Sequence, residues 1–397
     1  MYDFNIIDKE ENKFRLAIVV IGYNRLLEVK QLASSLLKAD YGDSHVPLVF
    51  SIDHGNNKEL NDYVQKFKWP YGEKHVILHS ERQGLKKHIF FCAGLSKYFK
   101  GVILLEDDCY VFPDFYNYTL QMLDSYSDDN HVAQISLFCD LVDCFGKIPF
   151  YPLHRKSDVF AIQTVSTWGE CFTFQMWRSF LKWSESFNDD FDAVDLPEEE
   201  RQWPNAWSKY YDAYMVESGK YAISPYCGHV SNFGAQGVHE SAGCRAHTLP
   251  ELGCKKYCTL PLKLLPHYDS HFCNTDVCEK LNIPLQKTCI DFGGVNRLYY
   301  SKQHYDYLLT LQKYPYPVLK SFGLSFTPVE LNIFMDCEGN GIYLYDLRGE
   351  ERYVKGKNPI DFIHYHIRGF NFKLLVFYVF HNFVKRVFFK CIKLIRR

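Results

Sequence analysis

The chain has 397 residues, of which 47% are hydrophobic and 23% are charged. This composition is typical of a folded protein with a large core, and it excludes a disordered or collagen-like chain. The 45 basic and 47 acidic side chains leave a net charge of −2, so we expect no nucleic-acid partner.

Short apolar runs alternate with helical patterns over the first hundred residues. The apolar runs cover 16–22, 47–52, 75–80 and 101–105, and stretches with helical spacing lie between them at 26–39, 60–67 and 88–99. Strands that alternate with helices in this way predict an α/β fold with a doubly wound, mostly parallel sheet.

Polar residues follow three of these expected strands directly. They are Asn24 and Arg25 after the first strand, Asp53 after the second, and Glu106, Asp107 and Asp108 after the fourth. Ligands of doubly wound sheets bind at the carboxyl ends of the strands, so these residues are expected to lie at one site.

The three adjacent carboxylates, Glu106, Asp107 and Asp108, suggest a metal site. Placing them at the end of a buried strand is costly unless a cation neutralises them, and hard oxygen ligands favour Mn²⁺ or Mg²⁺. The alternative is a solvated acidic turn.

The alternation breaks down after residue 140. Residues 168–183 predict a helix after a loop, and the acidic stretch 189–200 predicts a solvated loop. Residues 326–336 and 341–347 look like strands on either side of a turn at 337–340. We therefore expect a main domain over 1–290, a small β-rich unit over 291–365, and a basic aromatic helix over 366–397.

The last segment has a composition of its own. It contains ten Phe, Tyr and Leu residues between positions 370 and 389, and no Asp or Glu. Its eight basic residues are Arg368, Lys373, Lys385, Arg386, Lys390, Lys393, Arg396 and Arg397. A basic amphipathic helix of this kind favours peripheral contact with an anionic membrane, and the alternative is a helix packed on the body of the protein.

The fourteen cysteines give no clear metal or disulfide pattern. The first residues are polar and mixed in charge, with no signal-like apolar run, and no stretch is long and apolar enough for a membrane span. We therefore expect a cytoplasmic protein with reduced thiols. Cys244, Cys254, Cys258, Cys273 and Cys278 lack the close pairs of a structural zinc site, which favours buried or incidental thiols.

Six stretches carry a resemblance to a known family. They read AIVVIGYNR, VFSIDHG, LLEDDCYVFPDFYNY, STWGECFTFQMW, WPNAW with YYDAYM, and SPYCGHVSNFGAQGVH, within residues 16–241. Together they resemble the GT-A nucleotide-sugar glycosyltransferases, in particular the Golgi N-acetylglucosaminyltransferase that starts complex N-glycans and bacterial enzymes of the family 2 type.

The resemblance implies roles for the residues at the strand ends. Asp53 would hold the uracil of a UDP-sugar, with Asn24 and Arg25 near the base and ribose. Asp108 would bind the metal, while Glu106 and Asp107 would contact the ribose and the donor sugar. The loop at Trp168 and Gly169 would face the donor or the acceptor sugar.

Two further assignments follow from the same resemblance, and a third comes from the helix start at 83–88 itself. Asp212 matches the catalytic base, although three extra residues separate it from WPNAW, and Asp192 and Asp195 are the alternatives. His239 would complete the metal or diphosphate site. The helix start at 83–88 could offer backbone N–H groups to the diphosphate.

The expected activity is a metal-dependent, inverting transfer from a nucleotide-diphosphate sugar, most simply a UDP-sugar. The acceptor would be a glycan or a lipid-linked sugar in surface-polysaccharide synthesis at the inner face of the membrane. One alternative is a sugar-nucleotide nucleotidyltransferase, although GYNRLLEVK lacks the glycine-rich basic loop that such an enzyme needs. The other is a non-catalytic carbohydrate-binding or scaffold protein.

Overall fold

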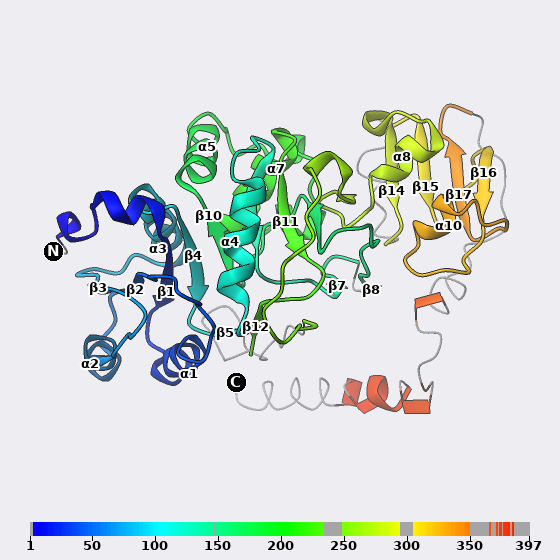
Figure 1. Cartoon of the computed structure of the whole chain (residues 1–397). Helices are drawn as coiled ribbons and strands as arrows, with labels where there is room; N and C mark the ends of the chain where they lie inside the picture. Colours follow the sequence, from blue (N-terminus) through cyan, green and yellow to red (C-terminus); the bar gives the residue numbers. More distant parts are fainter. Residues whose placement is uncertain are drawn as a thin grey trace, which may run out of the picture.

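The computed structural model describes residues 3–146, 148–233, 248–293 and 305–349, together with 365–366, 371, 373–374, 376–381 and 383–384. Its centre is a nine-stranded sheet in the order β13-β9-β11-β6-β10-β4-β1-β2-β3 (Figure 1). In chain order the strands are β1 (Leu16–Gly22), β2 (Leu48–Ile52), β3 (Lys74–Leu78), β4 (Gly101–Glu106), β6 (Val132–Ser136), β9 (Val159–Ile162), β10 (Glu170–Phe172), β11 (Tyr221–Pro225) and β13 (His267–Tyr268).

The sheet is mostly parallel. β1 pairs in parallel with both β2 and β4, and β2 pairs in parallel with β3. β10 runs antiparallel between β4 and β6, and β9 runs antiparallel to β11. The α/β class predicted from the alternating pattern is therefore confirmed, and the antiparallel strands belong to the region after residue 140, where that pattern breaks down.

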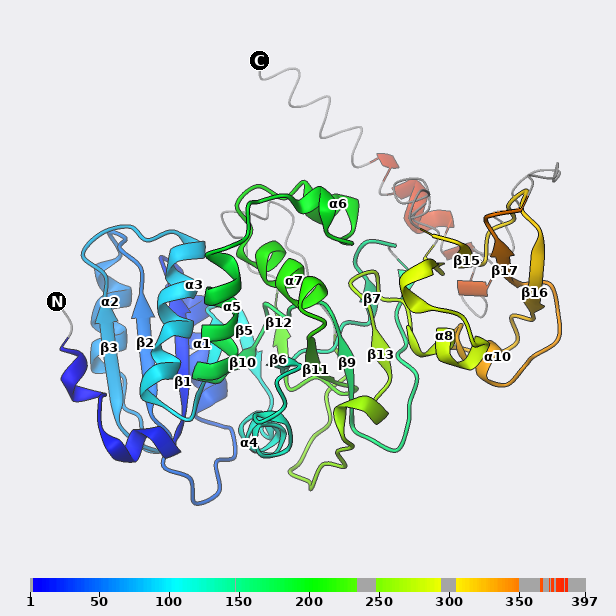
Figure 2. The ribbon, with the colours of Figure 1, turned by 90° about the horizontal axis from the view of Figure 1, so that it is seen from above.

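Helices cover both faces of the sheet (Figure 2). One face packs against α1 (Leu26–Leu36), α2 (Lys58–Lys66) and α4 (Phe115–Tyr126), and the other against α3 (Leu85–Gly94), α5 (Phe174–Ser184) and α7 (Trp207–Glu217). The helix expected over 168–183 begins only at Phe174, because Thr173 caps it by accepting a hydrogen bond from the N–H of Met176. Residues 170–172 join the sheet instead.

Shorter elements flank these strands and helices. They are the strands β5 (Cys109–Val111), β7 (Val142–Asp143), β8 (Ile148–Pro149) and β12 (Val230–Asn232), the helices α6 (Glu198–Arg201) and α8 (Asp276–Leu281), and 3₁₀ turns at Phe4–Ile6, Glu10–Phe14, Leu95–Tyr98, Phe191–Ala193, Leu262–Leu264 and Leu285–Lys287. β5 pairs with β12, and β7 pairs with β8, whereas α8 packs against the small sheet described next.

A small four-stranded sheet lies at the end of the molecule far from the N-terminus (Figures 1 and 2). Its order is β14-β15-β17-β16, with bounds β14 (Thr288–Asp291), β15 (Tyr307–Thr310), β16 (Val318–Phe322) and β17 (Ile342–Asp346). The strand expected at 341–347 is therefore present. The strand expected at 326–336 is wrong, because this segment contains helix α10 (Leu331–Phe334) and buries Val329 and Ile333, four residues apart.

The described part of the C-terminal segment is helical in places and exposed. Helical residues occur among 373–384, and the large apolar side chains described there are between 48% and 68% exposed. Across the described residues, no helix has the length and apolar character needed to cross a membrane.

Candidate active site

The residues expected at the strand ends do come together. Because β4, β1 and β2 are adjacent and parallel, their carboxyl ends meet at one edge of the sheet. Arg25, which follows β1, forms ion pairs with Asp107 and Asp108, which follow β4. Asn24 contacts the loop that follows Asp53, because the Asn57 side-chain amide donates to the Asn24 carbonyl at 2.9 Å.

Asp53 is buried and heavily hydrogen-bonded. It is 2% exposed and accepts hydrogen bonds from the N–H groups of His54, Gln83 and Gly84, and it forms an ion pair with Arg82. Burial alone would raise the pKa of its carboxyl, but these donors and the Arg82 charge hold that pKa below its usual range. Two N–H groups of the loop at 83–88, expected to face a diphosphate, are therefore directed to Asp53.

The carboxylates of Asp107 and Asp108 share one guanidinium. The Arg25 Nη1 atom lies 3.2 Å from Asp108 Oδ2, while Nε and Nη2 donate to Asp107. Burial raises the pKa of Asp107 to about 6, despite the nearby Arg25 charge. Asp108 Oδ1 is buried and has no hydrogen-bond partner among the described groups.

These oxygens suit a hard divalent cation. A carboxylate oxygen without a hydrogen donor is the kind of ligand that Mn²⁺ and Mg²⁺ take, and such ions commonly complete their shell with water and phosphate oxygens. Among the residues that the structure describes, no group of three or more His, Cys, Asp or Glu side chains forms a self-contained metal site. Asp108 therefore offers a cation one carboxylate oxygen that has no hydrogen donor among the described groups.

Two glutamates lie at this edge of the sheet, Glu106 at the end of β4 and Glu170 at the start of β10. Burial, together with the charges of Asp108 and Asp107, raises the pKa of Glu106 to about 8. Glu170 on β10 lies opposite Leu104, two residues before Glu106, and is 1% exposed. Burial and the charge of Glu106 raise the pKa of Glu170 well above its usual range. Sequence analysis missed Glu170, although it follows Trp168 and Gly169 directly.

The loop with Trp168 and Gly169 reaches the same edge. The Gly169 carbonyl accepts a hydrogen bond from the N–H of Leu137, just after β6, and Trp168 packs edge-on against Phe138 at 4.9 Å between ring centroids. Gly169 has a φ of +86°, and a Cβ atom there would lie 2.8 Å from Val230. Only glycine allows this close approach without strain.

Asp212 lies on α7, beneath the start of that loop. It is 2% exposed, and its Oδ1 atom accepts a hydrogen bond from the N–H of Val165 at 2.5 Å. Burial and the neighbouring Glu200 charge raise the pKa of Asp212 well above its usual range, and burial raises that of Glu200 to about 7. Sequence analysis missed Glu200, which belongs to the stretch expected to be a solvated loop and is wholly buried.

The alternative bases lie elsewhere in the loop before α6. The Asp192 side chain is 94% exposed and lies 3.7 Å from Arg201. Asp195 contacts His271 at 3.1 Å and accepts a hydrogen bond from Tyr305 at 3.0 Å. His239 lies outside the described residues, so its assignment stays a prediction.

No protein-family model and no curated protein matches the chain. Among solved structures, it is similar to the mannosyltransferase PcManGT from Pyrobaculum calidifontis in complex with GDP-Man and Mn²⁺, with 15% identity and a TM-score of 0.36 over 54% of this chain and 55% of that one. It is also similar to TarS from S. aureus in complex with UDP-GlcNAc, with 13% identity and a TM-score of 0.37 over 57% and 60%. A third similar structure is GalNAc-T7 with UDP, GalNAc and Mn²⁺, with 12% identity and a TM-score of 0.39 over 56% and 43%.

The matches cover about half of this chain and about half of those structures. All three TM-scores are below 0.5, so these similarities carry no conclusion about function.

Proposed function

We propose that the protein is a metal-dependent glycosyltransferase that takes its sugar from a nucleotide-diphosphate donor, for which we propose a UDP-sugar. The observation that carries the proposal is the meeting of Asp53, Arg25, Asp107 and Asp108 at the carboxyl edge of the parallel sheet. This edge is where α/β sheets bind nucleotides. The six sequence motifs support the same assignment.

In this proposal, the residues after β1, β2 and β4 contact different parts of the donor. Asp53 would accept a hydrogen bond from the base only after one of its present donors, such as Arg82, moves away, and Asn24 and Arg25 border the ribose. Asp108 holds Mn²⁺ or Mg²⁺, which supplies positive charge to the diphosphate leaving group. Glu106 and Asp107 face the ribose and the donor sugar, and Trp168 with Gly169 borders the sugar-binding region.

Inverting transfer also needs a base for the acceptor hydroxyl. We assign this role to Asp212, which lies beneath the start of the loop with Trp168 and Gly169 and whose pKa is raised by burial and by the Glu200 charge. In the conformation described here Asp212 is 2% exposed, so the base role requires the 163–169 loop to move away from it. Glu200, in contact with Asp212, would then tune the pKa of the pair.

Donor binding tests the proposal directly. Titration of UDP in the presence of Mn²⁺ should give saturable binding that chelation of the metal abolishes. Asp108→Asn should weaken that binding by about tenfold or more, because a metal-ligating oxygen loses its charge. Asp124→Asn, an exposed aspartate paired with Lys100, is the matched control and should bind as the wild type does.

If UDP and GDP both fail to bind with Mn²⁺ or Mg²⁺, the donor assignment is wrong. If Asp108→Asn binds UDP as tightly as the wild type, the cation lies elsewhere. Release of UDP from UDP-sugars in the presence of acceptor glycans then separates an enzyme from a carbohydrate-binding protein.

For the acceptor, we propose a glycan or a lipid-linked sugar, reached at the cytoplasmic face of an anionic membrane during surface-polysaccharide synthesis. The support comes from the C-terminal segment, which carries eight basic residues and no acidic ones over 366–397. Among its described residues, Phe377, Tyr378 and Phe380 are 65–68% exposed. Exposed aromatic side chains next to basic ones are typical of helices that lie in a membrane interface.

A further inference from the structure

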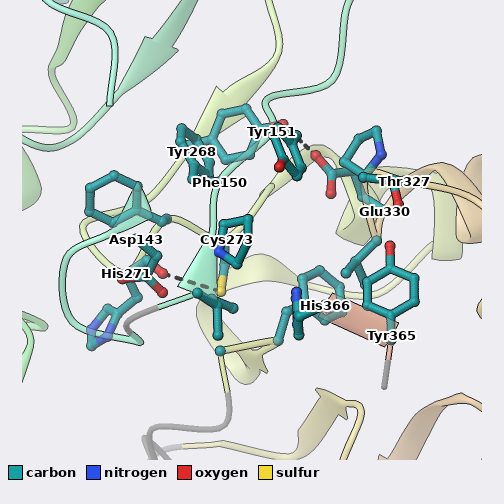
Figure 3. Close-up of a pocket in the computed structure, with 17 residues that line it drawn as sticks. Asp143, Phe150, Tyr151, Tyr268, His271, Cys273, Thr327, Glu330, Tyr365 and His366 are labelled. Carbon is teal, nitrogen blue, oxygen red and sulfur yellow. Dashed lines mark hydrogen bonds between the residues drawn. The ribbon is translucent and has the colours of Figure 1, made fainter. Parts of the chain in front are cut away.

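A pocket lies between the main body and the small C-terminal sheet (Figure 3). Its volume is about 180 Å³. One wall comes from the segment with β7 and β8 and from residues 268–273, and the other comes from residues 327–330 and from Tyr365 and His366. A cavity of about 150 Å³ holds one benzene molecule, so this pocket has room for a single six-membered ring.

Aromatic side chains make up much of the lining. They are Phe150, Tyr151, Tyr268, Phe272, Phe292 and Tyr365. The Phe150 ring packs edge-to-face against Tyr268 at 5.2 Å and against Phe272 at 5.0 Å between centroids, which fixes the orientation of its faces. The C–H faces of a sugar ring stack on such aromatic surfaces.

Polar groups converge on the same pocket. Asp143, His271, Glu330 and His366 all line it. Glu330 accepts a hydrogen bond from the Tyr268 hydroxyl, and Asp143 Oδ1 is held by the N–H groups of Phe145 and Gly146. Apolar pockets with a few fixed polar groups are typical of small-molecule sites.

The charge of the lining selects among ligands. None of the 17 described lining residues is Lys or Arg, whereas two are carboxylic acids. A phosphate or nucleotide would meet no positive side chain among them. A neutral ring with several hydroxyl groups can instead donate hydrogen bonds to the carboxyl oxygens and imidazoles.

The pocket also borders the loop that carries Asp195, an alternative to Asp212 as the catalytic base. His271, which lines the pocket, contacts Asp195 at 3.1 Å. A ligand bound in the pocket would therefore lie beside this loop.

We propose that this pocket binds one neutral sugar ring of the acceptor glycan. The acceptor part of this proposal rests on the proposed function, whereas binding of the ring itself does not.

The test measures binding without donor, metal or turnover. Saturation-transfer NMR on the full chain would use methyl glycosides of glucose, galactose, mannose and N-acetylglucosamine, with phenol as a non-sugar ring. We expect at least one glycoside to bind at millimolar concentration. Tyr151→Ala should weaken that binding about fivefold or more, and it should leave the fold intact because Tyr151 is 51% exposed. Ile148→Trp should fill the pocket and reduce binding as well.

Phe14→Ala is the matched control, since Phe14 is 76% exposed on the N-terminal turn and lines no part of the pocket. It should leave glycoside binding unchanged. The proposal is overturned if no glycoside binds, if phenol alone binds, or if Tyr151→Ala and Ile148→Trp both bind as the wild type does.

Failure here and failure of the proposed function give different results. Metal-dependent UDP binding without glycoside binding would overturn only the pocket assignment. Glycoside binding that Tyr151→Ala weakens, with no nucleotide binding under any condition, would support the ring site and overturn both the transferase assignment and the acceptor part of this inference. Transfer assays would support the acceptor part if Tyr151→Ala raises KM for the acceptor and leaves KM for the donor unchanged.

Discussion

At the scale of single residues, buried carboxyl groups are the main feature of the proposed site. Glu106, Asp107, Glu170, Glu200 and Asp212 all have pKa values raised above their usual range, with burial as the largest cause. Carboxyls with perturbed pKa values gather where proteins bind cations or move protons. Each buried acid also costs folding free energy, so the grouping of Glu106, Asp107 and Glu170 at one edge of the sheet is consistent with a functional role.

The sharpest test at this scale is Asp212→Asn. Asparagine keeps the size of the side chain and can still accept the hydrogen bond from Val165, but it cannot take a proton from the acceptor. We expect kcat to fall by about 10² to 10⁴-fold with little change in donor affinity. Steady-state kinetics with a fixed acceptor would measure both quantities.

Glu200→Gln serves as the companion variant, because Glu200 acts on Asp212 without being assigned as the base. It should shift the pH dependence of kcat more than it lowers its maximum. A near wild-type kcat in Asp212→Asn would move the base to Asp192 or Asp195, and the anomeric configuration of the product would decide between inversion and retention.

At the scale of elements, sequence alone predicted what local pattern controls. The strands β1, β2 and β4 are uninterrupted apolar runs that end in polar residues, so their positions and the site residues after them followed from the sequence. The position of α10 did not follow from the sequence. This helix has only four residues, which are too few to distinguish the alternation of a strand from the 3.6-residue repeat of a helix. Glu200 stands beside the exposed Glu199 in the same acidic run, and only its contact with α7 makes it a buried acid.

The C-terminal segment gives a prediction for one whole element. Tyr365 is 7% exposed and donates a hydrogen bond to the Phe326 carbonyl, and His366 lines the pocket. A deletion should therefore begin at Asn371, which leaves both residues in place. The shortened chain should no longer cosediment with vesicles of anionic lipid, while UDP binding is retained.

Salt identifies the force involved. Each basic residue near an anionic surface contributes about 1 kcal/mol, and screening weakens that contribution, so vesicle binding of the full chain should fall as salt rises. Neutral vesicles are the control. Unchanged cosedimentation of the shortened chain would place the membrane contact elsewhere, and loss of its cooperative unfolding would show that the segment packs on the body.

At the scale of the whole molecule, a buried polar contact joins the two sheets. Tyr268 on β13 of the large sheet donates a hydrogen bond to Glu330 at the start of α10, and the N–H of Leu153 donates to the Tyr268 hydroxyl at 2.6 Å. The ion pair between Arg155 and Asp276 lies in the same region at 3.0 Å, and the Asp276 charge acts on Glu330. The stability of this junction should therefore depend on the protonation of Glu330.

Burial, partly offset by the Tyr268 hydrogen bond, raises the pKa of Glu330 from 4.5 to about 7. The folded chain thus binds this proton more tightly than the unfolded chain does, and its contribution to stability falls as the pH rises from about 4.5 to about 7. A shift of this size corresponds to about 3 kcal/mol.

Glu330→Gln stays neutral, so its free energy of unfolding should fall less than that of the wild type between pH 5 and pH 8. Urea unfolding at both pH values, with the exposed Glu338→Gln as the control, measures the difference. Equal losses in the wild type and in Glu330→Gln would mean that Glu330 is already ionised at pH 5, and that the junction between the two sheets does not respond to pH through this residue.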